Sequence, residues 1–154
     1  MKVQLDEQCV INANAQFWEQ MLAMTVEPVG VPDQFCVSPG HLHASVGLTG
    51  VWTGRIEVRM AEQLAYAATA AMMMQSVESV QEADALDATK EIANMIAGVI
   101  KSSLPRPCNM TVPESVVEPE GFCSLARTED SLVVAFHHDT GDLLVRVWEQ
   151  EYLQ

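Results

Sequence analysis

The chain has 154 residues, the length of one ordinary domain, and 49% of them are hydrophobic, enough to bury a core without disulfides or metals. Eight lysines and arginines stand against 21 aspartates and glutamates, so the formal net charge is −13 at pH 7. A chain this acidic repels nucleic-acid phosphates and anionic lipid surfaces, which argues against a nucleic-acid partner and against a peripheral membrane protein. We therefore expect a single globular domain over residues 1–154.

The sequence shows neither the apolar segment of a signal peptide nor one long enough to span a membrane. The first residues hold no continuous apolar segment of the kind found in signal peptides. The longest apolar run, residues 65–74, is about half of the roughly 20 residues that span a bilayer. We expect a cytoplasmic protein.

The cysteines and histidines offer a weak case for a metal site. The cysteines are scattered and form no Cys-x-x-Cys pair, so we interpret all four as small apolar side chains rather than as disulfides or metal ligands. These cysteines are Cys9, Cys36, Cys108 and Cys123. The segment His137-His138-Asp139, with His41 and His43, could suggest a metal site, but adjacent strand residues point to opposite faces. We therefore predict no metal or cofactor bound by this chain.

Hydrophobic periodicity predicts the order helix, strands, two helices and strands. Proline and glycine between 27 and 34 indicate a loop, and Pro105 and Pro107 end the last helix. The predicted helices cover residues 9–24, 61–77 and 81–103, and the predicted strands cover 43–48, 55–60, 112–117, 121–125, 132–137 and 143–148. The turn of the first hairpin is expected near Gly50 or Gly54, and that of the last hairpin at 139–142.

Large apolar side chains outside these patterns allow two interpretations. The cluster Met72-Met73-Met74 could form a partner surface, but a packed core is the simpler interpretation. Trp18, Trp52 and Trp148 are expected in the core or at an interface.

The most informative segment is 87–98, in the long predicted helix. At about 100° per residue, four of its residues fall on one stripe, and the apolar residues Ile92, Met95, Ile96 and Val99 fall on another face. The stripe consists of Asp87, Glu91, Asn94 and Gly98. Solvation alone can explain exposed acids, but asparagine and glycine are poor choices inside a helix, which hints at a function. Gly98 also leaves room for a partner's backbone.

This stripe resembles the signature helix of the CheC/CheX/FliY chemotaxis phosphatases, Asp-x-x-x-Glu-x-x-Asn followed here by Met-Ile-Ala-Gly. The segments 11–13, 47–50 with Gly54, and 110–113 are similar to family segments as well, so the resemblance extends over about 10–148. Glu91 is the one glutamate with an asparagine three residues later, and a single motif resembles CheX rather than CheC. We expect no additional flagellar-switch domain of the FliY type, since these 154 residues leave no room for one.

The resemblance implies an enzyme that hydrolyses the aspartyl phosphate of a phosphorylated CheY-type response regulator. In that case Asn94 orients the attacking water, Glu91 pairs with a lysine of the partner, and Asp87 and Gly98 support the contact. Mg²⁺ is expected in the partner's phosphorylation site, not on this chain. Glu91 as a general base is the alternative role, and a catalytically idle module that binds a response regulator is the alternative function.

Together with the element order, the resemblance predicts one α+β domain. It has a largely antiparallel sheet of about six strands in two pseudo-repeated halves, with the long helices on one face. The resemblance also implies a homodimer joined by strand pairing. The apolar strands 132–137 and 143–148 favour this, since an open apolar edge is an association hazard. The alternative is a monomer whose edge is covered by the tail 149–154 or by a helix.

Overall fold

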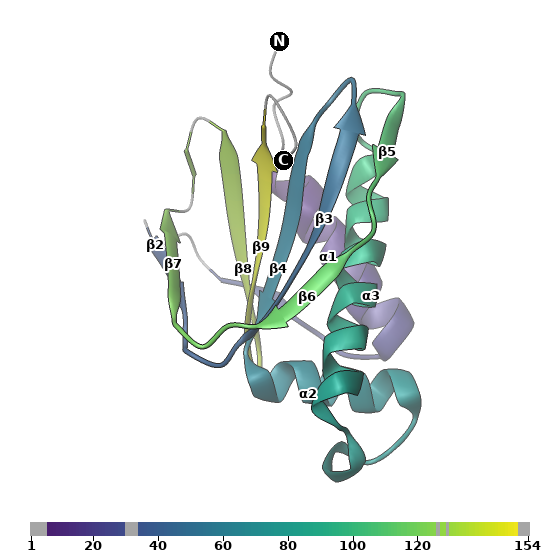
Figure 1. Cartoon of the computed structure of the whole chain (residues 1–154), viewed down its shortest axis with the longest axis vertical. Helices are drawn as coiled ribbons and strands as arrows, with labels where there is room; N and C mark the ends of the chain where they lie inside the picture. The colour runs from purple at the N-terminus through teal and green to yellow at the C-terminus, as the bar shows by residue number, and fades with distance from the viewer. Residues whose placement is uncertain (1–5, 30–33, 126, 129, 151–154) are drawn as a thin grey trace.

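A computed structural model describes residues 6–29, 34–125, 127–128 and 130–150 (Figure 1). Its elements follow the predicted order of helix, strands, two helices and strands. The helices are α1 (Glu7–Leu22), α2 (Glu62–Met73), the short 3-10 helix η1 (Val77–Ser79) and α3 (Glu82–Lys101). The strands are β1 (Glu27–Pro28), β2 (Gln34–Val37), β3 (Leu42–Gly50), β4 (Gly54–Met60), β5 (Cys108–Met110), β6 (Glu114–Val117), β7 (Phe122–Leu125), β8 (Ser131–His138) and β9 (Gly141–Glu149).

The main sheet has seven strands in the order β1-β8-β9-β4-β3-β5, with β6 also paired to β3. Every pair is antiparallel. The hairpins β3–β4 and β8–β9 are joined by the β4–β9 ladder, which runs from the pair Gly54↔Glu149 to the pair Met60↔Leu143. The predicted α+β class with a largely antiparallel sheet is therefore confirmed.

Helices α1 and α3 lie along one side of this sheet, and α2 lies below the lower end of its strands (Figure 1). Alternate strand residues such as Val46, Ile56 and Val145 point toward the helices and are fully buried, together with Ile92 and Ile96 of α3. Helix α1 precedes the β3–β4 hairpin but contacts β8, and α3 precedes the β8–β9 hairpin but contacts β3. None of the helices in the described ranges is long and apolar enough to span a membrane.

The other face of the sheet is partly covered by a two-stranded ribbon, β2–β7. A small apolar cluster joins the ribbon to β8 and β9, and it contains Phe35, Val37, Phe122, Val133, Ala135 and Leu144. Within the ribbon, Cys36 and Cys123 are directly opposite and form a disulfide, with 4.1 Å between their Cα atoms. The interpretation of all four cysteines as unpaired is therefore wrong for these two, while Cys9 and Cys108 are free.

Several predicted boundaries shift for local reasons. Helix α1 begins at Glu7, two residues earlier than expected, because the Oδ1 atom of Asp6 accepts a hydrogen bond from the backbone N–H of Gln8 at 3.0 Å. The predicted loop at 27–34 contains β1 and the start of β2, and its residues 30–33 lie outside the described residues. The three-residue strand β5 was missed because it is too short for an alternation pattern.

The prediction that the methionine cluster is packed core is wrong for two of its three residues. Helix α2 ends at Met73, and Met74 takes a left-handed conformation with φ of 53°. Met73 is 48% exposed and Met74 is 93% exposed, whereas Met72 packs against the core. Trp18 and Trp52 are buried as expected, and Trp148 is partly buried.

The dimer prediction was based on strands 132–137 and 143–148 forming an open edge of the sheet, and the structure does not show such an edge for 143–148. Strand β9 lies inside the sheet, between β8 and β4, so its backbone is paired on both sides. Strand β8 is partly covered by β1, and the N–H of Val29 donates to the carbonyl oxygen of Ala135 at 2.9 Å. The residues 151–154 of the alternative tail cover lie outside the described residues.

Candidate functional site

Helix α3 presents one buried face to the sheet and one accessible face to solvent. Its buried residues are Ala85, Ala88, Thr89, Ile92, Ala93, Ile96, Ala97 and Ile100. Met95 and Val99, which helical spacing placed on the apolar face with Ile92 and Ile96, are only partly buried and pack against the core. The small side chains of Ala93 and Ala97 are fully buried instead, beside Ile92, Ile96 and Ile100.

The helix is held firmly at its beginning and along its length. The backbone N–H of Gln81 donates to Oδ2 of Asp84 at 3.2 Å, as in a capping box. The hydroxyl of Ser115 on β6 donates to the carbonyl oxygen of Leu86 at 2.9 Å. The backbone that carries the side chains of the outer face of α3 is therefore held in place by hydrogen bonds.

The polar stripe lies on this outer face, as predicted. Glu91 and Gly98 are exposed, and Asn94 is half-buried. Within the described residues, neither the Glu91 carboxylate nor the Asn94 amide takes part in a hydrogen bond or ion pair. Two adjacent polar groups, one charged and one neutral, are thus free to bind a partner.

Asp87 differs from the other stripe residues because it already has a partner. Its Oδ1 atom lies 3.3 Å from Nζ of Lys90, and the Asp87 side chain is 76% exposed. An ion pair this exposed contributes little, about 0–1 kcal/mol, and water competes for it. A binding partner could displace Lys90, so a supporting contact by Asp87 is sterically open.

Gly98 completes the stripe with open space. A Cβ atom added at this position would meet no atom within 4 Å outside the local backbone of α3. The glycine is therefore not required by packing within the chain, and the backbone conformation does not require it either, since Gly98 is absent from the positive-φ residues. Neither packing nor backbone conformation among the described residues explains the glycine.

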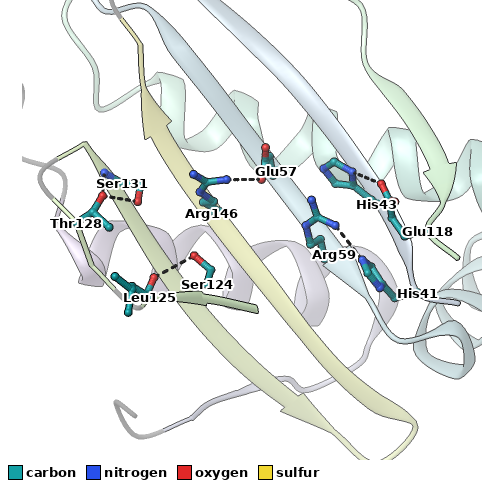
Figure 2. A network of polar contacts seen from close by, with 10 residues as sticks. All are labelled: His41, His43, Glu57, Arg59, Glu118, Ser124, Leu125, Thr128, Ser131 and Arg146. Carbon is teal, nitrogen blue, oxygen red and sulfur yellow. Dashed lines mark hydrogen bonds and ion pairs between the residues drawn. The ribbon is translucent and has the colours of Figure 1, made fainter. Parts of the chain in front are cut away.

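Sequence reasoning missed a second group of charged residues, which lies on the sheet face opposite the helices (Figure 2). Nη1 of Arg59 lies 3.0 Å from Nε2 of His41, and Nη1 of Arg146 donates to Oε2 of Glu57 at 3.3 Å. Nδ1 of His43 lies 3.2 Å from Oε1 of Glu118. The alternating segment 55–59 on β4 carried a signal for a polar outer face, but the partners from other strands were not predictable.

The two histidines of this network are held in the neutral form. Burial lowers the pKa of His41 and of His43 below 6.5, and the charge of Arg59 lowers both further. His41 must donate from Nδ1 to the carbonyl oxygen of Ser38, which leaves Nε2 to accept from Arg59. Nε2 of His43 is buried and has no hydrogen-bond partner among the described residues. Glu57 and Glu118 raise the pKa of His43, but burial and the charge of Arg59 outweigh them.

The candidate metal ligands do not converge. His41 and His43 belong to the network, whereas Nδ1 of His137 contacts Asp142 at 2.6 Å and Nδ1 of His138 contacts Thr140 at 2.8 Å. In the described part of the chain, no group of three or more histidine, cysteine, aspartate or glutamate side chains is arranged to hold an ion.

Comparisons with solved structures show where this architecture occurs. CheX from Vibrio vulnificus superimposes with a TM-score of 0.77 at 14% identity, over 97% of this chain and 100% of that chain. CheX from Desulfovibrio desulfuricans gives 0.73 at 22% identity, over 93% and 97%. A chain of the CheX–CheY–BeF3–Mg²⁺ complex from Borrelia burgdorferi gives 0.70 at 18% identity, over 96% and 100%. The fold is that of the CheX and CheC-like chemotaxis proteins.

A comparison of the sequence with protein families defines the assignment further. The family described as chemotaxis phosphatase CheX matches residues 42–137, which include the helix with the polar stripe. The search of the curated proteins found no match. The chain belongs to the CheX family of chemotaxis phosphatases.

Proposed function

We propose that this protein hydrolyses the aspartyl phosphate of a CheY-type response regulator, with Asn94 and Glu91 as the residues that act on it. Membership of a phosphatase family supports the reaction, and the similarity to a chain of a CheX–CheY complex supports the partner. The single observation that carries the residue assignment is the free Asn94 amide one turn from the free Glu91 carboxylate on a rigid, accessible helix.

Asn94 suits the task of holding the attacking water. In the proposed reaction the water oxygen bonds to phosphorus, the bond between phosphorus and the aspartyl oxygen breaks, and inorganic phosphate and a free aspartate result. Phosphoryl transfer passes through a loose transition state, so positioning and charge stabilisation supply most of the catalysis. An amide both donates and accepts, so it can fix a water without bringing negative charge to the phosphoryl oxygens.

Glu91 suits the task of docking. Its carboxylate next to a phosphoryl group would be repelled, but a carboxylate aimed at a lysine of the partner forms a charge-assisted hydrogen bond. Residues three apart are neighbours on a helix, so α3 presents both groups at once. In this proposal Mg²⁺ belongs to the phosphorylation site of the partner.

The test is phosphate release from a response regulator phosphorylated by a small-molecule donor, in the presence of Mg²⁺. We expect Asn94→Ala to lower the rate about 100-fold or more, the scale of losing one positioned transition-state contact, while binding of the regulator is largely kept. Glu91→Ala should also weaken binding, by about tenfold, because it removes a charge-assisted contact.

Two exposed residues of α1 serve as matched controls. Gln20→Ala and Glu19→Ala remove an amide and a carboxylate outside the stripe, and both should retain activity. Equal loss of binding in Asn94→Ala and Glu91→Ala would contradict the division of roles. A wild-type complex that forms without faster dephosphorylation would instead favour the idle binding module.

A further inference from the structure

A cleft of about 480 Å³ lies at the carboxyl end of α3, directly beyond the polar stripe. One wall is the last turn of the helix, and the other is the segment that leads into β5. The lining residues are Gly98, Lys101, Ser102, Arg106, Pro107, Cys108 and Asn109. Gly98 is thus shared by the stripe and the cleft.

The cleft continues the stripe geometrically. Lys101 follows Asn94 by seven residues, which is close to two helical turns and about 10 Å along the axis. A partner that covers Glu91 and Asn94 and extends along α3 past Gly98 reaches this cleft next.

Two positively charged side chains line this cleft, although the protein as a whole is strongly acidic. The chain has eight lysines and arginines against 21 acidic residues, and two of the eight, Lys101 and Arg106, line this one cleft. Within the described residues, neither takes part in an ion pair or side-chain hydrogen bond. A lysine in the last turn of a helix can be explained by the helix dipole, but Arg106 lies beyond the helix and cannot.

The last carbonyl oxygens of the helix already have donors within the chain. The carbonyl oxygen of Val99 accepts from the hydroxyl of Ser102 at 2.6 Å, and that of Ile100 accepts from the N–H of Ser103 at 2.9 Å. The carbonyl of Lys101 accepts from the N–H of Leu104 at 3.0 Å. The helix end still carries partial negative charge, so an anion in the cleft depends on the two cations to offset it.

The walls of the cleft are preformed. Strand β5 pairs with β3, and the N–H of Val51 donates to the carbonyl oxygen of Pro107 at 3.0 Å. A side chain at Gly50 would collide with that same carbonyl, so the two segments touch closely. Cys108 is buried, and its thiol lies 3.7 Å from the carbonyl oxygen of Trp52. Binding here requires little ordering of the backbone, which favours affinity.

We propose that this cleft anchors an aspartate or glutamate side chain of the response regulator while its phosphorylation site covers Asn94. The inference rests on the proposed function, and it adds the direction in which the partner lies along α3. Acidic Asp87 and Glu91 lie on one side of Asn94, and basic Lys101 and Arg106 lie on the other. The partner therefore needs a cation opposite Glu91 and an anion opposite Arg106, and a reversed orientation brings like charges together.

The test compares Arg106→Glu with Arg127→Glu, an identical change of charge at an exposed arginine that lines a separate pocket with Glu7 and Phe35. Both are measured with the phosphorylated regulator over a range of its concentrations. Arg106→Glu should raise KM at least about fivefold with kcat nearly unchanged, because charge at an interface rim acts on association. Lys101→Gln should raise KM less, and Arg127→Glu should match the wild type.

A second arm identifies the partner's carboxylate. Acidic surface residues of the regulator are changed to lysine one at a time, and one of these changes should restore the KM of Arg106→Glu. If the wild type is active and Arg106→Glu behaves as Arg127→Glu does, the anchor is refuted while the proposed function stands. If the wild type neither binds nor dephosphorylates the regulator, the proposed function fails, and the anchor fails with it.

Discussion

Replacing Gly98 tests whether a partner approaches the backbone of α3. Glycine in a helix interior costs about 0.8–1.0 kcal/mol relative to alanine, and helix ends fray, so we take about 0.5–1 kcal/mol for a position one turn before the end. An added Cβ meets nothing within 4 Å outside the local helix backbone, so no steric cost offsets this gain. Gly98→Ala should therefore raise the free energy of unfolding by that amount and raise Tm by about 1–4 °C. Urea unfolding and thermal melts measure both.

A large side chain at position 98 should lower the phosphatase activity, even though alanine at that position should raise the stability. Gly98→Gln keeps good helix propensity, but its side chain stands where the partner would lie. We expect it to lower kcat/KM for the phosphorylated regulator by about tenfold or more, since a displacement of about 1 Å at a reacting centre can cost 100-fold. Ala83→Gln, at an exposed alanine of the same helix, is the matched control and should keep full activity.

Two results would refute this reasoning. A loss of stability in Gly98→Ala would mean that the surroundings of Gly98 are more crowded than the structure shows. Full activity in Gly98→Gln would mean that no partner backbone comes close to the stripe, and the glycine would then be unexplained.

Three further predictions concern the rest of the molecule. The lowered pKa of His43 makes the folded state lose stability as the pH falls from 6.5 toward that lowered pKa, because the unfolded chain takes up the proton first. In His43→Gln the free energy of unfolding should fall less between about pH 7.5 and pH 5.5 than it does in the wild type. An equal fall in both proteins would contradict this prediction. Denatured but unreduced protein should show two reactive thiols rather than four, because Cys36 and Cys123 are bonded, and a count of four would refute the disulfide. The family resemblance predicts a homodimer that persists in about 0.5 M salt, since screening weakens the repulsion between chains of charge −13. Light scattering that gives about 17 kDa at low and high salt would end this prediction.

The hydrophobic periodicity of the sequence was enough to predict α3, the helix that carries the candidate site. The periodic pattern of 81–103 defined α3 to within two residues at each end, because helix formation depends on neighbours three and four residues apart. Helical geometry then placed Glu91, Asn94 and Gly98 on one face without any knowledge of the fold. The family signature could be read for the same reason, since its residues lie within one helix.

Contacts between distant segments were decided by the tertiary structure alone. Cys36 and Cys123 are 87 residues apart, and they meet only because β2 pairs with β7. Strand β9 looked like an open edge because its sequence cannot show that β4 covers it. The segment after Arg106 is fixed beside α3 by the pairing of β5 with β3, whose residues are about 60 positions earlier in the sequence. Sequence spacing determines which residues share a face of one element, whereas the choice of neighbouring elements depends on how the whole chain buries its apolar surface.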